Sequence, residues 1–365
     1  MATPARPPVP PGSLTDVAGV RVGHAHRRGR GWQTGTTVVF VPDGAVAAVD
    51  VRGGGPGTRE TDALAPENVV DRIHAVCLTG GSAYGLCAAD GVMSFLERHQ
   101  LGVRVGPEPS AVVPVVPTAV IFDLGRGGSF ANRPDASFGA RAIAAARSGN
   151  VARGSVGAGT GARAGGLQGG VGMASTRLSL GTVSPGTVSL GEESITVSAL
   201  AVVNAIGSVI DPASGLPWLS PTGLRRPSRS ERAALLATTA PPSSLNTTIG
   251  VVCTDAHITR AEAGRLAMSA HDGLARAIRP AHLMMDGDTV FALSTAARPL
   301  AEADVADEPR AGSSRAALLS TLFAAGADVF GAACTDAVLS ATTSPGCLCY
   351  RDLCPSAFAP GSGRT

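Results

Sequence analysis

The chain has 365 residues, of which 44% are hydrophobic and 16% are charged. This composition excludes a disordered, solvated chain, because disorder requires low hydrophobicity and high net charge. A formal charge of +2 and only 4% aromatic residues give no electrostatic footprint for nucleic acid or an anionic membrane, and few side chains for base stacking. The N-terminus lacks the apolar core of a secretory signal, and the longest apolar stretch, residues 111–122, is too short to span a bilayer. We expect a soluble, cytoplasmic protein with no nucleic-acid or membrane partner.

The N-terminal part of the chain predicts strands, a helix and a linker. Residues 36–51 are two β-branched, apolar runs around Pro42-Asp43-Gly44, which predicts a strand, a tight turn and a second strand. The apolar spacing over residues 82–100, with Ser at the start and Gly beyond the end, predicts a helix. A further apolar strand ends at Asn204. Residues 211–245 then have the turn-rich composition of an exposed linker.

The C-terminal part begins with a predicted strand at NTTIGVVCT. Thr259 and Glu262 have the spacing of a capping box for the next helix, which Pro280 ends. Residues 285–295 predict a turn and another strand, and a long apolar helix follows, with Ser313 and Ser314 as its caps. The helix between this capping box and Pro280 has an apolar stripe, which consists of Leu266, Ala270, Leu274, Ala277 and Ile278. Because strands and helices interleave without regular βαβ spacing, we expect an α+β layered sandwich and not a doubly wound sheet.

A glycine-rich segment, VGAGTGARAGG over residues 156–166, contains Gly157-x-Gly159-x-x-Ala162. This spacing resembles a dinucleotide-binding fingerprint, but that motif needs a helix that opens on it. Here more glycines follow, which would destabilise a helix. We therefore expect a loop that lines a site or packs closely, and no cofactor.

The boundary Asn246-Thr247-Thr248 is a candidate nucleophile site. A hydroxyl residue opens a strand directly after a turn-rich segment, as in the self-cleaving precursor of an N-terminal nucleophile. Cleavage before Thr247 would free an α-amine with a pKa of about 7.7–8.0, which is suited to deprotonate the hydroxyl of the same residue. The alternative is that β-branched residues simply begin a strand here.

Asp286-Gly287-Asp288 is a candidate acidic pair at the entrance of a strand. Two close carboxylates raise the pKa of one of them, and they can hold an ammonium group or support a catalytic Thr. The alternative is a solvated turn. The seven histidines show no triad-like or metal-binding spacing, and the C-terminal cysteines lack a fourth ligand at zinc-site spacing. We expect no metal.

Seven motifs carry a family resemblance over most of the chain. In chain order they are DVRGGGPGTRETD (50–62), LTGGSAYGL (78–86), VGAGTGA (156–162), VVNAIGSVID (202–211), NTTIGVVCTDA (246–256), MDGDTVFALST (285–295) and GSSR (312–315). With these motifs the sequence resembles the DmpA family of self-processing L-aminopeptidases/D-esterases and β-aminopeptidases. It is most similar to the branch with a Thr nucleophile, which includes nylon-oligomer hydrolases.

The resemblance implies one catalytic domain over residues 1–365 with a four-layer α/β/β/α sandwich. It implies autocleavage between Asn246 and Thr247 into fragments 1–246 and 247–365, which stay associated and assemble as a homo-oligomer, a tetramer of processed pairs. The implied activity is hydrolysis of an amide or ester bond in a peptide or small molecule through an acyl-Thr intermediate.

The site residues follow from the same resemblance. Thr247 is the implied nucleophile, and Asn204 is the implied donor to the oxyanion. Asp286 and Asp288 are the implied acidic pair near the nucleophile. The implied substrate-binding residues are Tyr84, Gly159 and Arg163.

One position departs from the family pattern. Many relatives have a Gly-Lys pair after the glycine-rich loop, whose Lys approaches the nucleophile; here the pair is Gly165-Gly166, and the chain contains no Lys. Arg163 could supply positive charge there, but an Arg is not a general base. Two alternatives stay open. One is an acyltransferase of the ornithine-acetyltransferase type, which uses a similar Thr nucleophile and precursor cleavage. The other, which follows from the missing Lys, is a non-catalytic family member that does not self-process.

Overall fold

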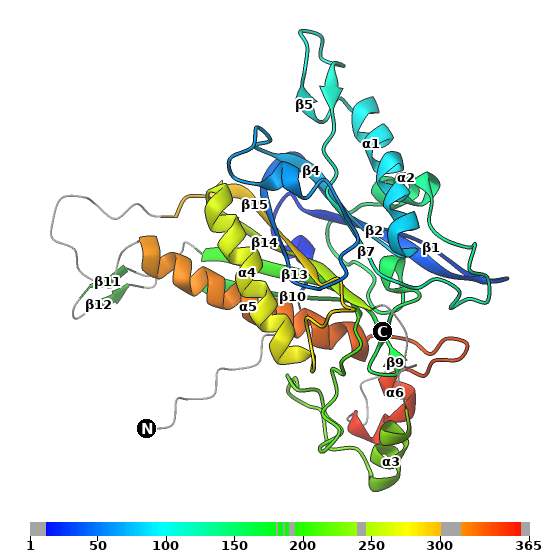
Figure 1. The fold of residues 1–365 in the computed structure, drawn as a ribbon. Coiled ribbons are helices and arrows are strands. Elements are labelled where there is room, and N and C mark those ends of the chain that lie inside the picture. The colour runs from blue at the N-terminus through cyan, green and yellow to red at the C-terminus, as the bar shows by residue number, and fades with distance from the viewer. Residues whose placement is uncertain are drawn as a thin grey trace.

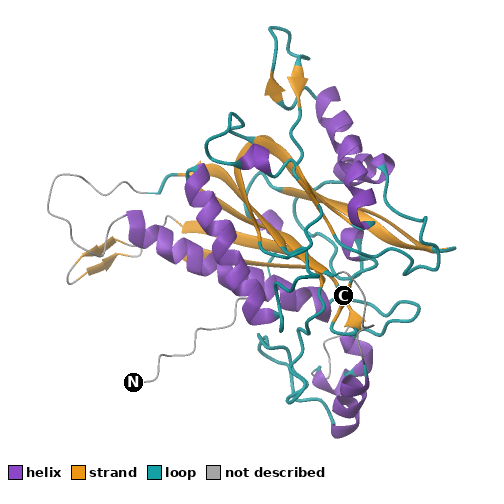
Figure 2. Ribbon diagram, in the orientation of Figure 1, coloured by secondary structure: helices purple, strands orange, loops and turns teal. Residues whose placement is uncertain are grey.

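In the computed structural model the chain forms four layers, helix, sheet, sheet and helix (Figures 1 and 2). The structure describes residues 12–179, 182–184, 187–189, 194–238, 246–300 and 315–358. Ser313, Ser314 and most of the GSSR motif lie outside the described residues. The expected α+β sandwich is confirmed.

Strands supply the two inner layers. Their bounds are β1 Arg21–Gly29, β2 Trp32–Val51, β3 Thr58–Arg59, β4 Ile73–Thr79, β5 Val103–Arg104, β6 Val112–Val113, β7 Thr118–Val120, β8 Arg163–Ala164, β9 Leu167–Gln168, β10 Gly170–Ser179, β11 Thr182–Ser184, β12 Thr187–Ser189, β13 Ser194–Asn204, β14 Thr247–Ala256 and β15 Thr289–Arg298.

Helices supply the outer layers and the connections. The α-helices are α1 Ala88–Arg98, α2 Ala136–Ala144, α3 Arg229–Ala237, α4 Arg260–Ala277, α5 Arg315–Leu339 and α6 Tyr350–Leu353. Short 3₁₀ helices are η1 Leu14–Asp16, η2 Asp62–Leu64, η3 Ser82–Cys87, η4 Gly157–Gly159 and η5 Pro355–Ala357.

Among the described residues, nine strands form one hydrogen-bonded sheet: eight follow each other in the order β10-β13-β14-β15-β2-β4-β7-β3, and β1 pairs with β2 off this path. The N-terminal half of β2 pairs with β1 and β4, whereas its C-terminal half pairs with β15. Strand β2 is therefore shared by both sheet layers.

The expectation of a strand, a turn and a second strand over residues 36–51 is wrong, because β2 is one strand of 20 residues. Its register against β4 shifts between Phe40 and Ala45, and Gly44 lies between them with φ of +74°. A left-handed glycine serves a β-bulge as well as a reverse turn. Here the bulge bends the strand and does not reverse it.

Three separate apolar cores fill the spaces between the four layers. The central core packs the two sheets face to face and includes Val39, Leu78, Leu200, Val251 and Phe291. A second core lies between the β10-β13-β14-β15 layer and helices α4 and α5, and the third lies between the other layer and helices α1 and α2.

Helices α4 and α5 cover the sheet that carries β14 (Figure 1). The predicted capping box of α4 is present: the Thr259 side chain accepts from the Glu262 N–H, and Glu262 accepts from the Thr259 N–H. Helix α5 is the one helix of the described residues that is long and apolar enough to cross a membrane, and half of its most apolar window is buried in the protein. Phe330 and Ala333 of α5 belong to the core beneath it, as in the core helix of a layered protein.

The predicted linker at residues 211–245 is more ordered than its composition suggests. It contains α3, whose Ser228 and Glu231 form a capping box. Glu231 also accepts a hydrogen bond from the Ser356 backbone N–H at 2.9 Å. This segment therefore packs against the C-terminal part of the chain, and residues 239–245 lie outside the described residues.

Candidate active site

Thr247 is the first residue of β14, a strand that lies between β13 and β15. It is directly opposite Asn204, the last residue of β13. Directly opposed residues of an antiparallel pair project their side chains to the same face with about 4.5–5.5 Å between Cβ atoms. The strand pairing thus brings together two of the predicted site residues, and both are buried.

The carbonyl of Asn246 has two donors. The backbone N–H of Gly287 donates to it at 3.1 Å, and the Thr247 hydroxyl donates to it through a short contact. Asn246 is also bridged in parallel fashion to Asp286. The carbonyl of the peptide bond before Thr247 is thereby fixed between an N–H group and a hydroxyl group.

Asp286 and Asp288 are each 2% exposed, so the solvated-turn alternative does not hold. Asp288 accepts from the Thr248 N–H at 2.7 Å through one carboxylate oxygen, and Asp286 accepts from the Leu283 N–H at 2.9 Å. Burial, followed by the charge of Asp288, raises the pKa of Asp286 to about 6. Asp286 therefore takes up or releases a proton near neutral pH.

The loop after β2 packs on this acidic turn through its backbone. Arg52 and Gly55 donate their N–H groups to the carbonyls of Asp288 and Asp286 at 2.9 and 2.8 Å. A Cβ at Gly53 would lie 2.3 Å from the Asp286 carbonyl oxygen, so only glycine permits this approach. The motif around RGGG is thus a support for the acidic turn.

Two histidines that the sequence analysis did not single out lie next to the acidic pair: His282 contacts Asp288, and His271 contacts His282. His282 contacts Asp288 twice, with Nδ1 at 2.8 Å and its backbone N–H at 3.1 Å from the same carboxylate oxygen. The ring of His282 packs edge-on against the buried ring of His271, with 4.9 Å between centroids. Burial lowers the pKa of His271 to about 4, so this imidazole is neutral and its Nε2 donates to the Asp50 carbonyl at 3.0 Å.

The amide side chain of Asn204 has partners at both ends. Its Oδ1 accepts from the Arg163 backbone N–H at 3.0 Å and from the Arg126 guanidinium through a short contact. Its Nδ2 donates to the Phe122 carbonyl at 3.3 Å. Arg126 is a further site residue that the sequence did not reveal, because nothing in its local pattern points to Asn204.

The glycine-rich loop forms η4 and then the small hairpin of β8 and β9. It leads into this hairpin and not into an α-helix, which a dinucleotide fingerprint would require. Gly159 is buried, and a Cβ there would lie 2.5 Å from the backbone nitrogen of Val171, so this glycine serves close packing against β10. Gly165 and Gly166, with φ of +54° and +88°, make the hairpin turn.

Of the predicted substrate-binding residues, Arg163 lies next to Asn204, whereas Tyr84 is exposed. Arg163 is next to the site through its backbone N–H, while its guanidinium Nε is buried and has no hydrogen-bond partner in the described part of the chain. Tyr84 lies in η3 and is 55% exposed, with the guanidinium of Arg133 3.7 Å from its ring centre. None of the hydrogen bonds between described residues links Tyr84 to Thr247 or Asn204.

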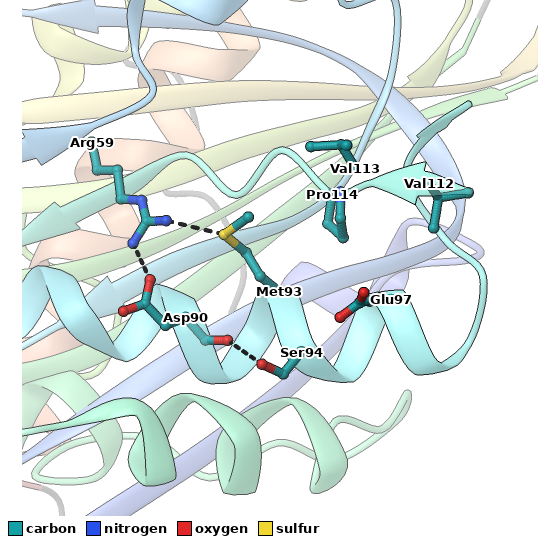
Figure 3. A pocket seen from close by; sticks show the side chains of 8 residues that line it. All are labelled: Arg59, Asp90, Met93, Ser94, Glu97, Val112, Val113 and Pro114. Atoms are coloured by element: carbon teal, nitrogen blue, oxygen red, sulfur yellow. Dashed lines mark hydrogen bonds and ion pairs between the residues drawn. The ribbon is translucent and has the colours of Figure 1, made fainter. Parts of the chain in front are cut away.

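A surface pocket of about 410 Å³ lies elsewhere, between α1 and the segment that follows β5 (Figure 3). Arg59 lies at one end of it, bonded to Asp90 and to the Met93 sulfur. None of its lining residues belongs to the arrangement around Thr247. Within the described residues no group of three metal-binding side chains occurs.

The arrangement around Thr247 has the parts that acyl-transfer chemistry needs. A hydroxyl lies beside a buried carboxyl pair, one member of which titrates near neutral pH, and an amide side chain on the same face can donate to developing negative charge. Such an arrangement suits the cleavage of an amide or ester bond.

Comparison with known proteins gives the family. The model of peptidase family S58 matches residues 12–348, and this chain belongs to that family. It is 49% identical over 360 residues to an uncharacterized aminopeptidase from Mycobacterium tuberculosis, covering 95% of this chain and 99% of the relative. It is 34% identical over 338 residues to a 6-aminohexanoate-oligomer endohydrolase from Kocuria, covering 89% and 84% of the two chains. The resemblance seen in the sequence is confirmed, and the chain is a hydrolase that acts on amides.

Solved structures share the fold. A β-aminopeptidase from Burkholderia superposes with a TM-score of 0.64 at 22% identity, covering 98% of this chain and 97% of the other. The L-aminopeptidase/D-Ala-esterase/amidase from Ochrobactrum anthropi, described as a variant of the Ntn hydrolase fold, superposes with a TM-score of 0.67 at 20% identity, covering 94% and 91%.

Proposed function

We propose that this protein is a self-processing hydrolase that cleaves amide bonds with Thr247 as its N-terminal nucleophile. The observation that carries the proposal is the contact of the Thr247 hydroxyl with the carbonyl of Asn246, the residue before it. The Gly287 N–H holds the same carbonyl oxygen at 3.1 Å. A nucleophile, a carbonyl and an oxyanion donor are thus assembled on one peptide bond.

Self-cleavage begins when the Thr247 oxygen attacks the carbonyl carbon of Asn246. The hydroxyl proton passes to a nearby base, and the Gly287 N–H stabilises the charge that forms on the carbonyl oxygen. The C–N bond breaks, the Thr247 nitrogen takes a proton, and an ester joins the two residues. Water then hydrolyses this ester, which leaves a carboxylate on Asn246 and a free amine on Thr247.

Asp286 is the better candidate for the base in this step. Both oxygens of Asp288 already accept N–H groups, from Thr248 and His282. Asp286 has one oxygen on Leu283 and a pKa raised to about 6, close to the range in which a general base is effective. We therefore assign Asp288 to orientation of the strand and Asp286 to proton transfer.

Turnover uses the amine that cleavage releases. The Thr247 amine accepts the hydroxyl proton while the oxygen attacks the substrate carbonyl, and Asn204 donates from its side-chain amide to the oxyanion. The amine product leaves with a proton, and water releases the acyl group from Thr247. This mechanism needs no Lys, and the free amine replaces Asp286 as base.

The substrate class we propose is an amide with a free amino group near the scissile bond. The buried acidic pair offers negative charge that can hold an ammonium ion. A relative named as an aminopeptidase suits such substrates. We further propose that the protein is cytoplasmic and works as an oligomer of processed pairs.

The experiment is a denaturing intact-mass spectrum of fresh protein, with N-terminal sequencing of each fragment. We expect two fragments that together weigh one water more than the 36.4 kDa chain, the smaller one beginning Thr-Thr-Ile-Gly. Release of amine from aminoacyl amides in plain buffer then separates hydrolysis from acyl transfer, which would require an acceptor amine. Persistence of the intact chain without amide turnover would overturn the proposal and favour a non-catalytic family member.

A further inference from the structure

The orientation of the Asn204 amide is decided by its neighbours. The Arg163 N–H and the Arg126 guanidinium both donate to one end, and the Phe122 carbonyl accepts at the other. A flipped amide would set its NH₂ group against two donors and its oxygen against a carbonyl. The Asn204 oxygen therefore faces the two arginine donors. The Nδ2 group has two N–H bonds, and only one of them donates to the Phe122 carbonyl.

Arg126 is itself held firmly. Its guanidinium also donates to the Gly161 carbonyl at 2.6 Å, and its backbone N–H donates to the Asp123 carbonyl at 3.3 Å. Burial lowers its pKa to about 10, so the guanidinium stays charged at neutral pH. It thus places a fixed positive charge against the oxygen of Asn204.

A charge in this place polarises the amide. A cation bonded to Oδ1 draws electron density toward the oxygen and makes the N–H groups of Nδ2 stronger donors. Arg163 contributes only a neutral backbone N–H to the same oxygen.

We propose that Arg126 is a positioning residue for the oxyanion donor, acting through Asn204. It locks the Asn204 amide with Oδ1 toward the two arginine donors, which leaves one N–H of Nδ2 for an oxyanion formed at Thr247, and it strengthens this N–H electrostatically. This inference rests on the proposed function, because it assumes an oxyanion formed at Thr247. Arg126 does not itself touch the substrate in this scheme.

The test is a double-mutant cycle on the full-length protein with Arg126→Met and Asn204→Ala, followed by kcat and KM per mole of mature protein. Loss of one oxyanion donor lowers kcat by about 10²–10³-fold, and we expect this for Asn204→Ala. Arg126→Met should lower kcat by at least tenfold, with KM nearly unchanged. Because both residues act through one amide, the double variant should be no slower than Asn204→Ala.

If Arg126→Met does not fold, Arg126→Lys replaces it in the same cycle, since it keeps a charge but not the fork of donors. Arg153→Gln is the matched control, because Arg153 is a half-buried arginine like Arg126 but lies outside the site. Its guanidinium pairs with Asp336. It should keep kcat even where its Tm falls. Equal kcat in Arg126 variants and wild type, or losses that multiply with Asn204→Ala, would overturn the inference. A wild-type protein without amide turnover would instead defeat the proposed function.

Discussion

Gly287 lies directly against the nucleophile: a Cβ at this position would be 2.9 Å from the Thr247 hydroxyl oxygen and 2.9 Å from the Gly55 carbonyl oxygen. We expect Gly287→Ala to slow self-cleavage by about 10²-fold, since displacing a reacting group by an ångström costs about that much. Time-resolved mass spectrometry of the precursor measures it.

Gly264→Ala is the control for that variant. Gly264 lies within α4, and a Cβ there meets nothing within 4 Å. It should stabilise the protein by about 0.5–1 kcal/mol, because alanine favours a helix over glycine, and leave self-cleavage as fast as in the wild type. Cleavage of Gly287→Ala at the rate of Gly264→Ala would contradict the assembly described for the Asn246 carbonyl.

Thr247→Ala removes the hydroxyl and should abolish both self-cleavage and amide hydrolysis. Thr247→Ser keeps a hydroxyl in place and should retain self-cleavage at a measurable rate. Gel electrophoresis under denaturing conditions distinguishes the 36.4 kDa chain from its fragments. Cleavage of Thr247→Ala before residue 247 would show that another group attacks the bond.

Asp286 should give self-cleavage a pH dependence. With its pKa near 6, the carboxyl is protonated and inactive as a base at lower pH. We expect the cleavage rate to fall about tenfold for each pH unit below 6 and to level off above it. Asp286→Asn should lose this dependence of the cleavage rate on pH. A wild-type rate that is flat from pH 4.5 to 7.5 would rule out Asp286 as the base.

The same carboxyl should cost stability at higher pH. The pKa of Asp286 in the folded state is raised above its ordinary value of 3.8. The contribution of this carboxyl to the free energy of unfolding is therefore complete below pH 3.8 and is lost as the pH rises through 6. The Tm of the uncleaved Thr247→Ala protein should therefore fall between pH 5 and pH 7.5 by more than that of the same protein with Asp286→Asn. Calorimetry on Thr247→Ala, with and without Asp286→Asn, measures this on uncleaved protein.

His282 should matter through Asp288. Removing a hydrogen bond to a charged group costs about 1.5–3 kcal/mol, and His282→Ala should lower kcat by about tenfold or more. His282→Asn should recover most of this loss, because its amide can donate where Nδ1 does and because Asn tolerates the left-handed backbone at this residue, φ +57°. Equal kcat for both variants would mean that the ring acts only in packing.

Local patterns predicted most of the fold, because they depend on nearby residues. Apolar periodicity and a capping box predict α4, and a β-branched run predicts β14. The bend of β2 was not predictable, since a Pro-Asp-Gly sequence suits both a turn and a bulge. The position of Thr247 opposite Asn204 depends on strand pairing across the sheet, and only the family resemblance linked these two residues in advance.

The partners of site residues were harder to predict than the site residues themselves. His282, in the loop before β15, bonds to an acid six residues away, but its ring packs on His271 of helix α4. Arg126 reaches Asn204 across 78 residues of sequence. No spacing rule connects such pairs, because the fold alone brings them together. The family resemblance implies Tyr84 as a substrate-binding residue, and this side chain is 55% exposed in η3.

The strand order has a mechanical consequence for a protein cut before Thr247. Strands β14 and β15 come from the C-terminal fragment and lie between β13 and β2 of the N-terminal fragment. Each flank is held by a ladder of backbone hydrogen bonds. To separate, the fragments would have to break the β13·β14 and the β15·β2 hydrogen-bond ladders in the middle of the sheet and expose two apolar cores at once. A cut in the backbone would thus leave one inseparable body, with the new amine at an inner seam.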